Sequence, residues 1–290
     1  MKVALIQQQY YGSKEETLKS TTQKINEAAS GGAKLVVLQE LHQNEYFCQS
    51  EDTKFFDYAS DFEADVAFWG VVAKENSVVL VTSLFEKRAA GLYHNTAVVF
   101  ESDGSVAGKY RKMHIPDDPG FYEKFYFTPG DLGFEPIQTS VGKLGVLICW
   151  DQWYPEAARL MTLRGADMLI YPTAIGWFDG DNEAEKARQV DAWITIQRSH
   201  AIANGIPVLS CNRVGFEPDS CGVMSGINFW GNSFACGSQG ELIAHANHQN
   251  EEIIYANIDH NRTKEVRDIW PFLRDRRIDA YKNILKRYCD

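Results

Sequence analysis

The chain has 290 residues, of which 44% are hydrophobic and 23% charged, and its formal net charge is −10. The composition excludes a disordered or fibrous protein. The length allows one large α/β domain or two small ones. The acidic balance argues against a nucleic-acid-binding protein, because phosphate contacts need clustered Lys and Arg side chains. The sequence has no apolar run near the roughly 20 residues that span a bilayer and no signal-peptide pattern, so we expect a cytoplasmic protein without membrane contact.

Short apolar runs alternate with longer amphipathic stretches, which is the pattern of an α/β protein. One helix is predicted to start with the capping pair Ser13 and Glu16 and to end before Gly31, and Asp103-Gly104 marks a hairpin over residues 94–110. Further helices are expected over 61–75, from Pro155 to about 165 and over 183–204; strands are expected over 2–9, 34–39, 77–85, 141–149, 167–171, 207–211, 227–236, 241–245 and 252–258.

The domain organisation follows from the absence of any linker or low-complexity tract in the sequence, which predicts a single domain over residues 1–290. The tail, about residues 265–290, mixes basic and aromatic side chains and is too apolar for a disordered end. It either docks on its own domain or packs on a neighbouring subunit, and its sequence favours neither.

The cysteine and histidine spacings predict neither disulfides nor a metal site. The six cysteines include no CxxC pair, so we expect free thiols. The histidines lack the spacing of metal ligands.

Three chemically capable side chains are predicted to lie where strands end: Glu40, Lys112 and Cys149. In open α/β folds, ligands bind outside the carboxyl ends of strands, so these side chains are expected to meet at one pocket. A thiol with an ordinary pKa of about 8.5 needs a base or a nearby cation to act as a nucleophile, and Glu40 and Lys112 are candidates for these two roles. Each residue taken alone also has a structural interpretation, as a buried thiol or a solvated charge.

Two further residues have competing interpretations. Glu123 is flanked by aromatic residues, where a buried carboxylate needs a lysine or an amide N–H as partner. His114 is a rival activator for the thiol, because Cys–His dyads are common, but no Asn or Asp signature accompanies it and we favour a packed loop histidine.

The segments Gln39-Glu40, 110–112 (YRK) and 147–151 (LICWD) resemble those of the nitrilase superfamily of carbon–nitrogen hydrolases, and the resemblance runs from about residue 2 to 288. It implies an α/β fold, a four-layer α-β-β-α sandwich, and a catalytic triad of Glu40, Lys112 and Cys149. The second glutamate of the family falls on Glu123. The resemblance also implies that no cofactor or metal takes part, and that the protein is a homo-oligomer, a dimer or an assembly of dimers.

Four shorter segments, 45–49, 123–131, 149–156 and 171–176, are similar to the N-carbamoylputrescine amidohydrolase branch of this family. The similarity implies that a carbamoyl amine is hydrolysed through an S-carbamoyl cysteine. The substrate-binding residues would be Glu123, Tyr46, Trp150, Trp153, Thr173 and Ala174.

The expected substrate is a small cationic carbamoyl amine. Relatives that act on carbamoyl amino acids use arginines soon after the nucleophile, whereas Gln152 and Trp153 stand here, so an anionic substrate would lack its clamp. The acidic stretch from Asp179 to Glu185 is a candidate site for the ammonium group. Two alternatives stay open: a related amidase or β-ureidopropionase-like hydrolase, and a non-catalytic binding protein with the same fold.

Overall fold

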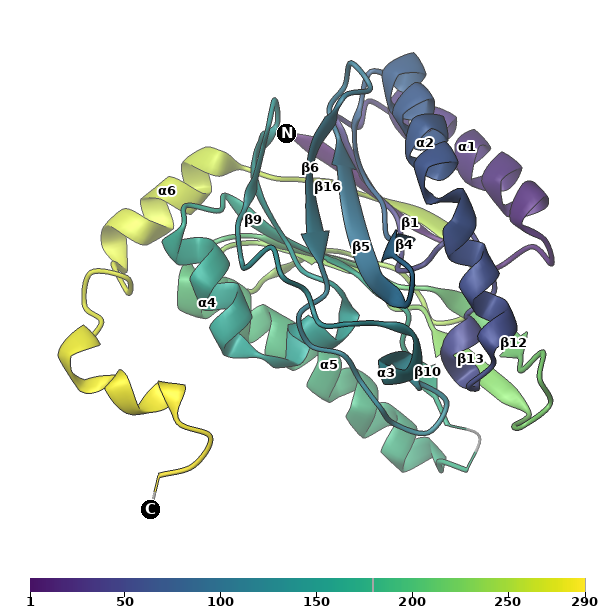
Figure 1. The fold of residues 1–290 in the computed structure, drawn as a ribbon. Helices are drawn as coiled ribbons and strands as arrows, with labels where there is room; N and C mark the ends of the chain where they lie inside the picture. Colours follow the sequence, from purple (N-terminus) through teal and green to yellow (C-terminus); the bar gives the residue numbers. More distant parts are fainter. Residues whose placement is uncertain (179, 290) are drawn as a thin grey trace.

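The computed structural model describes residues 1–178 and 180–289. Two β-sheets lie face to face at its centre, and a pair of helices covers the outer face of each sheet (Figure 1). The order of layers is therefore α-β-β-α, as predicted. This arrangement follows from the sequence pattern, because continuous apolar strands must be covered on both faces.

The first sheet has the strand order β16-β1-β2-β3-β5-β4, with β6 paired to β5. Its centre is parallel, since β1 pairs with β2 and β2 with β3 in the same direction, while the remaining pairs are antiparallel. Side chains of two helices, including Ile25 and Trp69, pack on its outer face. The strands are Lys2–Gln7 (β1), Leu35–Val37 (β2), Val79–Val81 (β3), Leu84–Ala89 (β4), Leu92–Phe100 (β5), Val106–Arg111 (β6) and Glu252–Asn257 (β16); the helices are Lys14–Ser30 (α1) and Phe62–Asn76 (α2).

The second sheet has the strand order β15-β14-β11-β9-β8-β7, and it too has a parallel centre, β11-β9-β8. Two helices pack against it through residues such as Ala158 and Trp193. The strands are Ile137–Thr139 (β7), Gly142–Val146 (β8), Met168–Pro172 (β9), Val208–Cys211 (β11), Phe234–Cys236 (β14) and Leu242–His245 (β15); the helices are Pro155–Leu163 (α4) and Glu183–Asn204 (α5).

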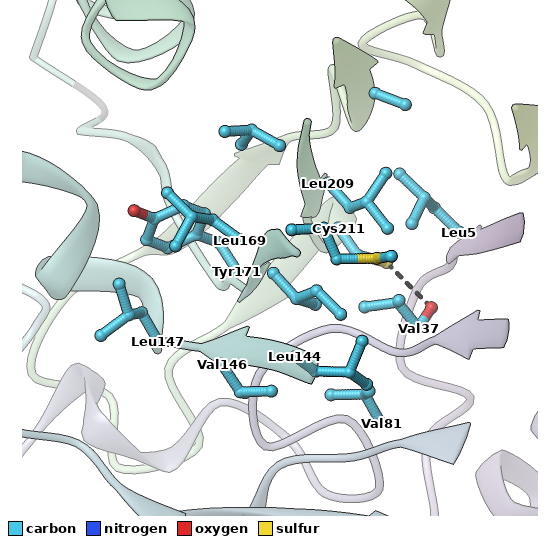
Figure 2. Close-up of a cluster of buried hydrophobic side chains, with 14 of the residues drawn as sticks. Leu5, Val37, Val81, Leu144, Val146, Leu147, Leu169, Tyr171, Leu209 and Cys211 are labelled. Atoms are coloured by element: carbon cyan, nitrogen blue, oxygen red, sulfur yellow. Dashed lines mark hydrogen bonds between the residues drawn. The ribbon is translucent and has the colours of Figure 1, made fainter. Parts of the chain in front are cut away.

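The core between the sheets is built from aliphatic side chains of both parallel centres. Leu5, Val37 and Val81 of the first sheet face Leu144 and Leu209 of the second, as Figure 2 shows. All of these side chains are fully buried. The close packing keeps the carboxyl ends of the two sets of parallel strands at a constant separation, and the candidate residues lie at those ends.

Most predicted elements are confirmed, and two predicted strands need correction. The strand expected over 77–85 is divided into β3 and β4, and at the break the hydroxyls of Thr82 and Ser83 donate to Val98 and Asn95 of β5, the strand that pairs with both. The strand expected over 227–236 is also two strands, Gly226–Trp230 (β13) and β14, which lie in different sheets. Gly231 and Asn232, with φ of 56° and 55°, turn the chain from one sheet to the other.

A third, smaller sheet has the strand order β10-β13-β12, with β10 at Gly176–Trp177 and β12 at Val214–Pro218. The remaining α-helices are short, α3 at Glu123–Tyr126 and α6 at His260–Ile269. Beyond α6 the chain extends away from the sandwich (Figure 1), with apolar side chains exposed, among them Ile278 and Leu285. Within residues 1–178 and 180–289, no helix is both long and apolar enough to cross a membrane.

Candidate active site

The structure brings the three predicted strand-end residues to one buried site. Glu40 follows β2, Lys112 follows β6, and Cys149 comes after β8. The backbone hydrogen bond from Glu40 N to Thr173 O, 3.2 Å, joins the ends of a first-sheet and a second-sheet strand. The residues predicted from separate segments come together because the parallel centres of the two sheets end at the same level of the sandwich.

Glu40 is fully buried and its carboxylate accepts three hydrogen bonds. Oε1 accepts from Asn95 Nδ2 and from Lys112 Nζ, both at 2.7 Å, and Oε2 accepts from the backbone N–H of Ala174 at 3.0 Å. The segment that carries Glu40 is tightly held, because Leu41 adopts φ of 47° and its N–H donates to Ser83 Oγ. The base candidate therefore has a single orientation, fixed by groups from both sheets.

Lys112 lies between two carboxylates, with Nζ 2.7 Å from Glu40 Oε1 and 2.6 Å from Glu123 Oε2. Burial by itself would lower the pKa of Lys112, but the charges of Glu123 and Glu40 raise it well above its ordinary value, so the ammonium form is kept. The second oxygen of Glu123 accepts from the hydroxyl of Tyr46 at 2.8 Å. Burial raises the pKa of Glu123 to about 7, although the charge of Lys112 opposes this shift.

Cys149 begins a short 3-10 helix, Cys149–Trp153, directly after the extended residues that continue β8. Its φ of 43° lies in the left-handed region, where a side chain other than glycine is strained, and such strain is common at functional sites. Burial raises the pKa of the Cys149 thiol well above its ordinary value, and the charge of Glu40 raises it further while that of Lys112 lowers it. The thiol is therefore neutral in the resting state and needs a base to become a nucleophile.

Asp151 connects the turn of Cys149 to the loop after Lys112. Its Oδ2 accepts from Ile148 N at 2.9 Å and from Tyr110 OH at 2.8 Å. Its Oδ1 accepts from the backbone N–H of His114 at 3.0 Å and contacts the ring Nδ1 of the same residue at 2.7 Å. The His114 ring also stacks on Tyr154. His114 thus packs in the loop as predicted, but one ground for that prediction was wrong, because His114 does have an aspartate partner, Asp151.

A cavity of about 650 Å³ opens next to the Cys149 side chain. Its wall includes three of the predicted substrate-binding residues, Trp150, Trp153 and Ala174. Two others, Tyr46 and Glu123, lie buried behind Lys112 and are joined to each other. The remaining lining residues are Pro116, Asp118, Pro119, Phe121, Ile175, Gly176, Phe178, Asp181, Glu185, Arg188, Gln189, Ala192 and Trp230.

Thr173 is placed differently from the other predicted binding residues. It is fully buried, and its hydroxyl donates to Gln152 Oε1 and to the carbonyl of Tyr171. Its carbonyl accepts from Glu40 N. The position of Thr173 therefore supports the backbone around the base, beneath the cavity wall.

Three carboxylates line the cavity, from the exposed Asp118 and the half-buried Asp181 and Glu185. Asp181 accepts from Gln189 Nε2 at 2.9 Å, and Glu185 forms an ion pair with Arg188, which also lines the cavity. Asp179, the first residue of the predicted acidic stretch, lies outside the described residues. The cavity lining therefore combines a buried thiol, aromatic side chains, and more exposed charged side chains of which three are acidic and one is basic.

The described part of the chain contains no group of three or more His, Cys, Asp and Glu side chains placed to hold a metal ion. All six cysteines are free thiols, in agreement with the sequence prediction.

The sequence reasoning missed two residues that shape this site, Asn95 and Arg213. Asn95 donates to Glu40, the candidate base, and its own oxygen accepts from Ser83. Arg213 is fully buried beneath the segment that carries Glu40. A signal was present for Arg213, because it follows the strand predicted over 207–211 and so satisfies the same strand-end rule as Cys149.

Comparison with known proteins agrees with this geometry. Residues 2–268 match the family model described as carbon-nitrogen hydrolase. The chain is 40% identical over 286 residues to the N-carbamoylputrescine amidase of Oryza sativa subsp. japonica, an alignment that covers 98% of this chain and 94% of that protein. It is 38% identical over 290 residues to the citrullinase of Francisella tularensis subsp. tularensis, which covers 99% of each chain.

A solved structure, that of a carbon-nitrogen hydrolase from Helicobacter pylori G27, superposes with a TM-score of 0.98 at 60% identity and covers 100% of this chain and 99% of that chain. The chain therefore belongs to the carbon-nitrogen hydrolase family. It is an enzyme that hydrolyses carbon–nitrogen bonds, and the predicted family and sandwich fold are confirmed.

Proposed function

We propose that this enzyme hydrolyses N-carbamoylputrescine to putrescine, carbon dioxide and ammonia, as a step of polyamine formation from agmatine. The observation that carries this proposal is the cavity, which is lined by the buried Cys149 thiol and by the more exposed carboxylates of Asp118, Asp181 and Glu185. A substrate with a carbamoyl group, an apolar linker and an ammonium group matches a cavity that combines a buried thiol, aromatic side chains and more exposed carboxylates. The relationship to plant N-carbamoylputrescine amidases supports the same substrate.

The first chemical step is attack by sulfur. Because burial keeps the Cys149 thiol neutral, Glu40 removes its proton as the sulfur forms a bond to the carbamoyl carbon. The electron pair of the C=O bond moves to oxygen. Lys112 Nζ and the backbone N–H of Trp150, which directly follows the nucleophile, donate to this oxyanion.

The second step releases the amine. The proton held by Glu40 passes to the substrate nitrogen, the carbon–nitrogen bond breaks, and putrescine leaves an S-carbamoyl group on Cys149. Water then adds to this group with Glu40 as base, which restores the thiol and gives carbamic acid, and this decomposes to carbon dioxide and ammonia. Glu123, held by Tyr46 and Lys112, orients the ammonium of Lys112 and the carbamoyl NH₂.

Citrulline is a second candidate substrate, because one observation favours it. Arg188 lines the cavity next to Glu185, so the cavity has a guanidinium as well as carboxylates. A citrulline end group carries both an ammonium and a carboxylate, which such a pair of charges would accept. A ureido acid such as N-carbamoyl-β-alanine ends in a carboxylate alone and would meet mostly acidic side chains.

The test measures ammonia release from N-carbamoylputrescine, citrulline and N-carbamoyl-β-alanine at equal concentrations, with Cys149→Ala as the control. We expect the first substrate to have the highest kcat/KM and the control to have no activity. A higher kcat/KM for citrulline would transfer the assignment to that substrate. Preference for N-carbamoyl-β-alanine would contradict the role of the cavity carboxylates.

The assembly and the location of the enzyme are part of the same proposal. We propose a cytoplasmic homo-oligomer whose single domain, residues 1–290, contacts a neighbouring subunit through the tail. The free thiols and the exposed apolar side chains of Ile278, Ile284 and Leu285 support it. Light scattering after size-exclusion chromatography should give at least twice the monomer mass of 32.8 kDa, and a monomer at micromolar concentration would contradict the proposal.

A further inference from the structure

The loop between β11 and β12 places one guanidinium beneath the segment that carries Glu40. Arg213 lies in this loop, and its side chain is 1% exposed. Nη2 donates to the carbonyl of Leu41 at 2.8 Å, and both Nη atoms donate to the carbonyl of Asn44 at 3.2 Å. A weaker contact of 3.4 Å reaches the carbonyl of Glu40 itself.

These contacts are made where the backbone is strained. Leu41 has a φ of 47°, a conformation that costs a leucine free energy and persists when surrounding groups enforce it. Arg213 binds the carbonyl of this residue, and Ser83 accepts from its N–H. The direction of the Glu40 side chain depends on this turn, because Leu41 is the next residue in the chain.

The ion-pair partner of Arg213 extends the same support to the other glutamate of the site. Glu217 Oε1 accepts from Arg213 Nη1 at 2.6 Å, and its Oε2 accepts from the backbone N–H of Tyr46 at 2.8 Å. The Tyr46 hydroxyl in turn donates to Glu123. One buried ion pair therefore holds both ends of residues 40–46, with the base at one end and the partner of Glu123 at the other.

We propose that Arg213, through its pair with Glu217, is a positioning residue for the base Glu40. It acts through the backbone, since the Glu40 carboxylate itself bonds to Asn95, Lys112 and the N–H of Ala174. A guanidinium is planar and holds several N–H donors in fixed directions, so it can bind several carbonyls and a carboxylate at the same time. A lysine ammonium lacks this fixed arrangement of donors. The inference rests on the catalytic role proposed for Glu40 and is independent of which substrate is turned over.

The test compares Arg213→Lys, which keeps the positive charge, with Val72→Ala, a control in the outer cluster of α2 and the first sheet. We expect both variants to lose stability, which urea unfolding measures. Val72 itself makes none of the side-chain hydrogen bonds between α2 and residues 40–46, which come from Asp65 and Trp69. A catalytic group displaced by about 1 Å loses on the order of 10² in rate, so we expect Arg213→Lys to lower kcat by about 10²-fold with KM within about threefold. Val72→Ala should keep wild-type kcat.

A second measurement needs no substrate. Alkylation of Cys149 by iodoacetamide, followed by peptide mass spectrometry, should slow in Arg213→Lys by a factor similar to kcat, since Glu40 removes the thiol proton. Alkylation of the exposed Cys289 serves as internal reference and should not change. If Arg213→Lys does not fold, Glu217→Asp takes its place, because it keeps the charge and withdraws the carboxylate from Tyr46; its expected loss is about tenfold.

A kcat and an alkylation rate equal to those of the control would overturn the inference, and so would a change in KM alone. If the wild-type enzyme releases no ammonia from N-carbamoylputrescine while Arg213→Lys still slows alkylation of Cys149, the proposed substrate fails and the positioning role stands. If turnover of N-carbamoylputrescine is confirmed but neither Arg213→Lys nor Glu217→Asp slows alkylation of Cys149, the proposed substrate stands and the positioning role fails.

Discussion

Replacing Lys112 with methionine should separate its electrostatic role from its catalytic role. The side chains of Lys112, Glu40 and Glu123 are all completely buried, and the ammonium lies 2.7 and 2.6 Å from the two carboxylates. Methionine has a similar volume but no charge. Breaking a buried ion pair from one side costs about 3–5 kcal/mol, because the remaining charge is left without compensation.

The loss should depend on pH. Without the ammonium, Glu123 must either stay charged beside Glu40 or bind a proton, although the pKa of a free glutamate is near 4.5. The variant therefore binds more protons when folded than when unfolded, so its free energy of unfolding falls as pH rises above about 4.5. Removing an oxyanion donor should also lower kcat by about 10²–10³-fold.

Two assays would test both parts: urea unfolding between about pH 5 and 8, and ammonia release. The pH range runs from about the ordinary pKa of a carboxyl group to above the raised pKa of Glu123. Lys112→Met/Glu123→Gln is the matched control. The double variant has one buried carboxylate fewer and should regain at least about half of the lost stability without regaining activity. A Lys112→Met enzyme as stable as wild type at pH 7 would refute the electrostatic reasoning. Wild-type turnover in either variant would refute the catalytic role.

Three further predictions concern other parts of the structure. Asp151→Asn replaces one oxygen that accepts two hydrogen bonds with a donor, so it should lower the free energy of unfolding by about 3 kcal/mol or more; an unchanged urea midpoint would argue against it. Gly104→Ala should lower it by about 1–3 kcal/mol with activity kept, because φ is +88° and the new Cβ would lie 2.5 Å from the carbonyl oxygen of Gly70; a loss of activity at equal stability would contradict this. Glu123→Gln should remove a pH dependence: the pKa of Glu123 is raised to about 7 in the folded state, so wild type loses stability as pH rises from 4.5 toward 7, and parallel urea curves for the two proteins across this range would be inconsistent with the shift.

Local patterns in the sequence were sufficient for most of the elements, apart from the breaks in the strands expected over 77–85 and 227–236, and for the candidate triad. The helix predicted over 183–204 is α5, Glu183–Asn204, because its start and end are set by neighbouring residues. Glu40, Lys112 and Cys149 were found because the end of an apolar run marks the end of a strand, and parallel strands present their carboxyl ends to one side of a sheet. This reasoning needs no knowledge of which strands are neighbours.

The tertiary structure alone decided how those residues are held. Lys112 bridges Glu40 and Glu123, Asp151 binds His114, and Arg213 supports Leu41, a residue that precedes it by 172 positions. Each of these contacts joins segments whose separation depends on the packing of two sheets, and no local period of the sequence encodes such a distance. The sequence by itself therefore indicated which groups are candidates for the chemistry, while the packing of the sandwich decided their orientation, because burial and charge compensation are properties of the assembled core.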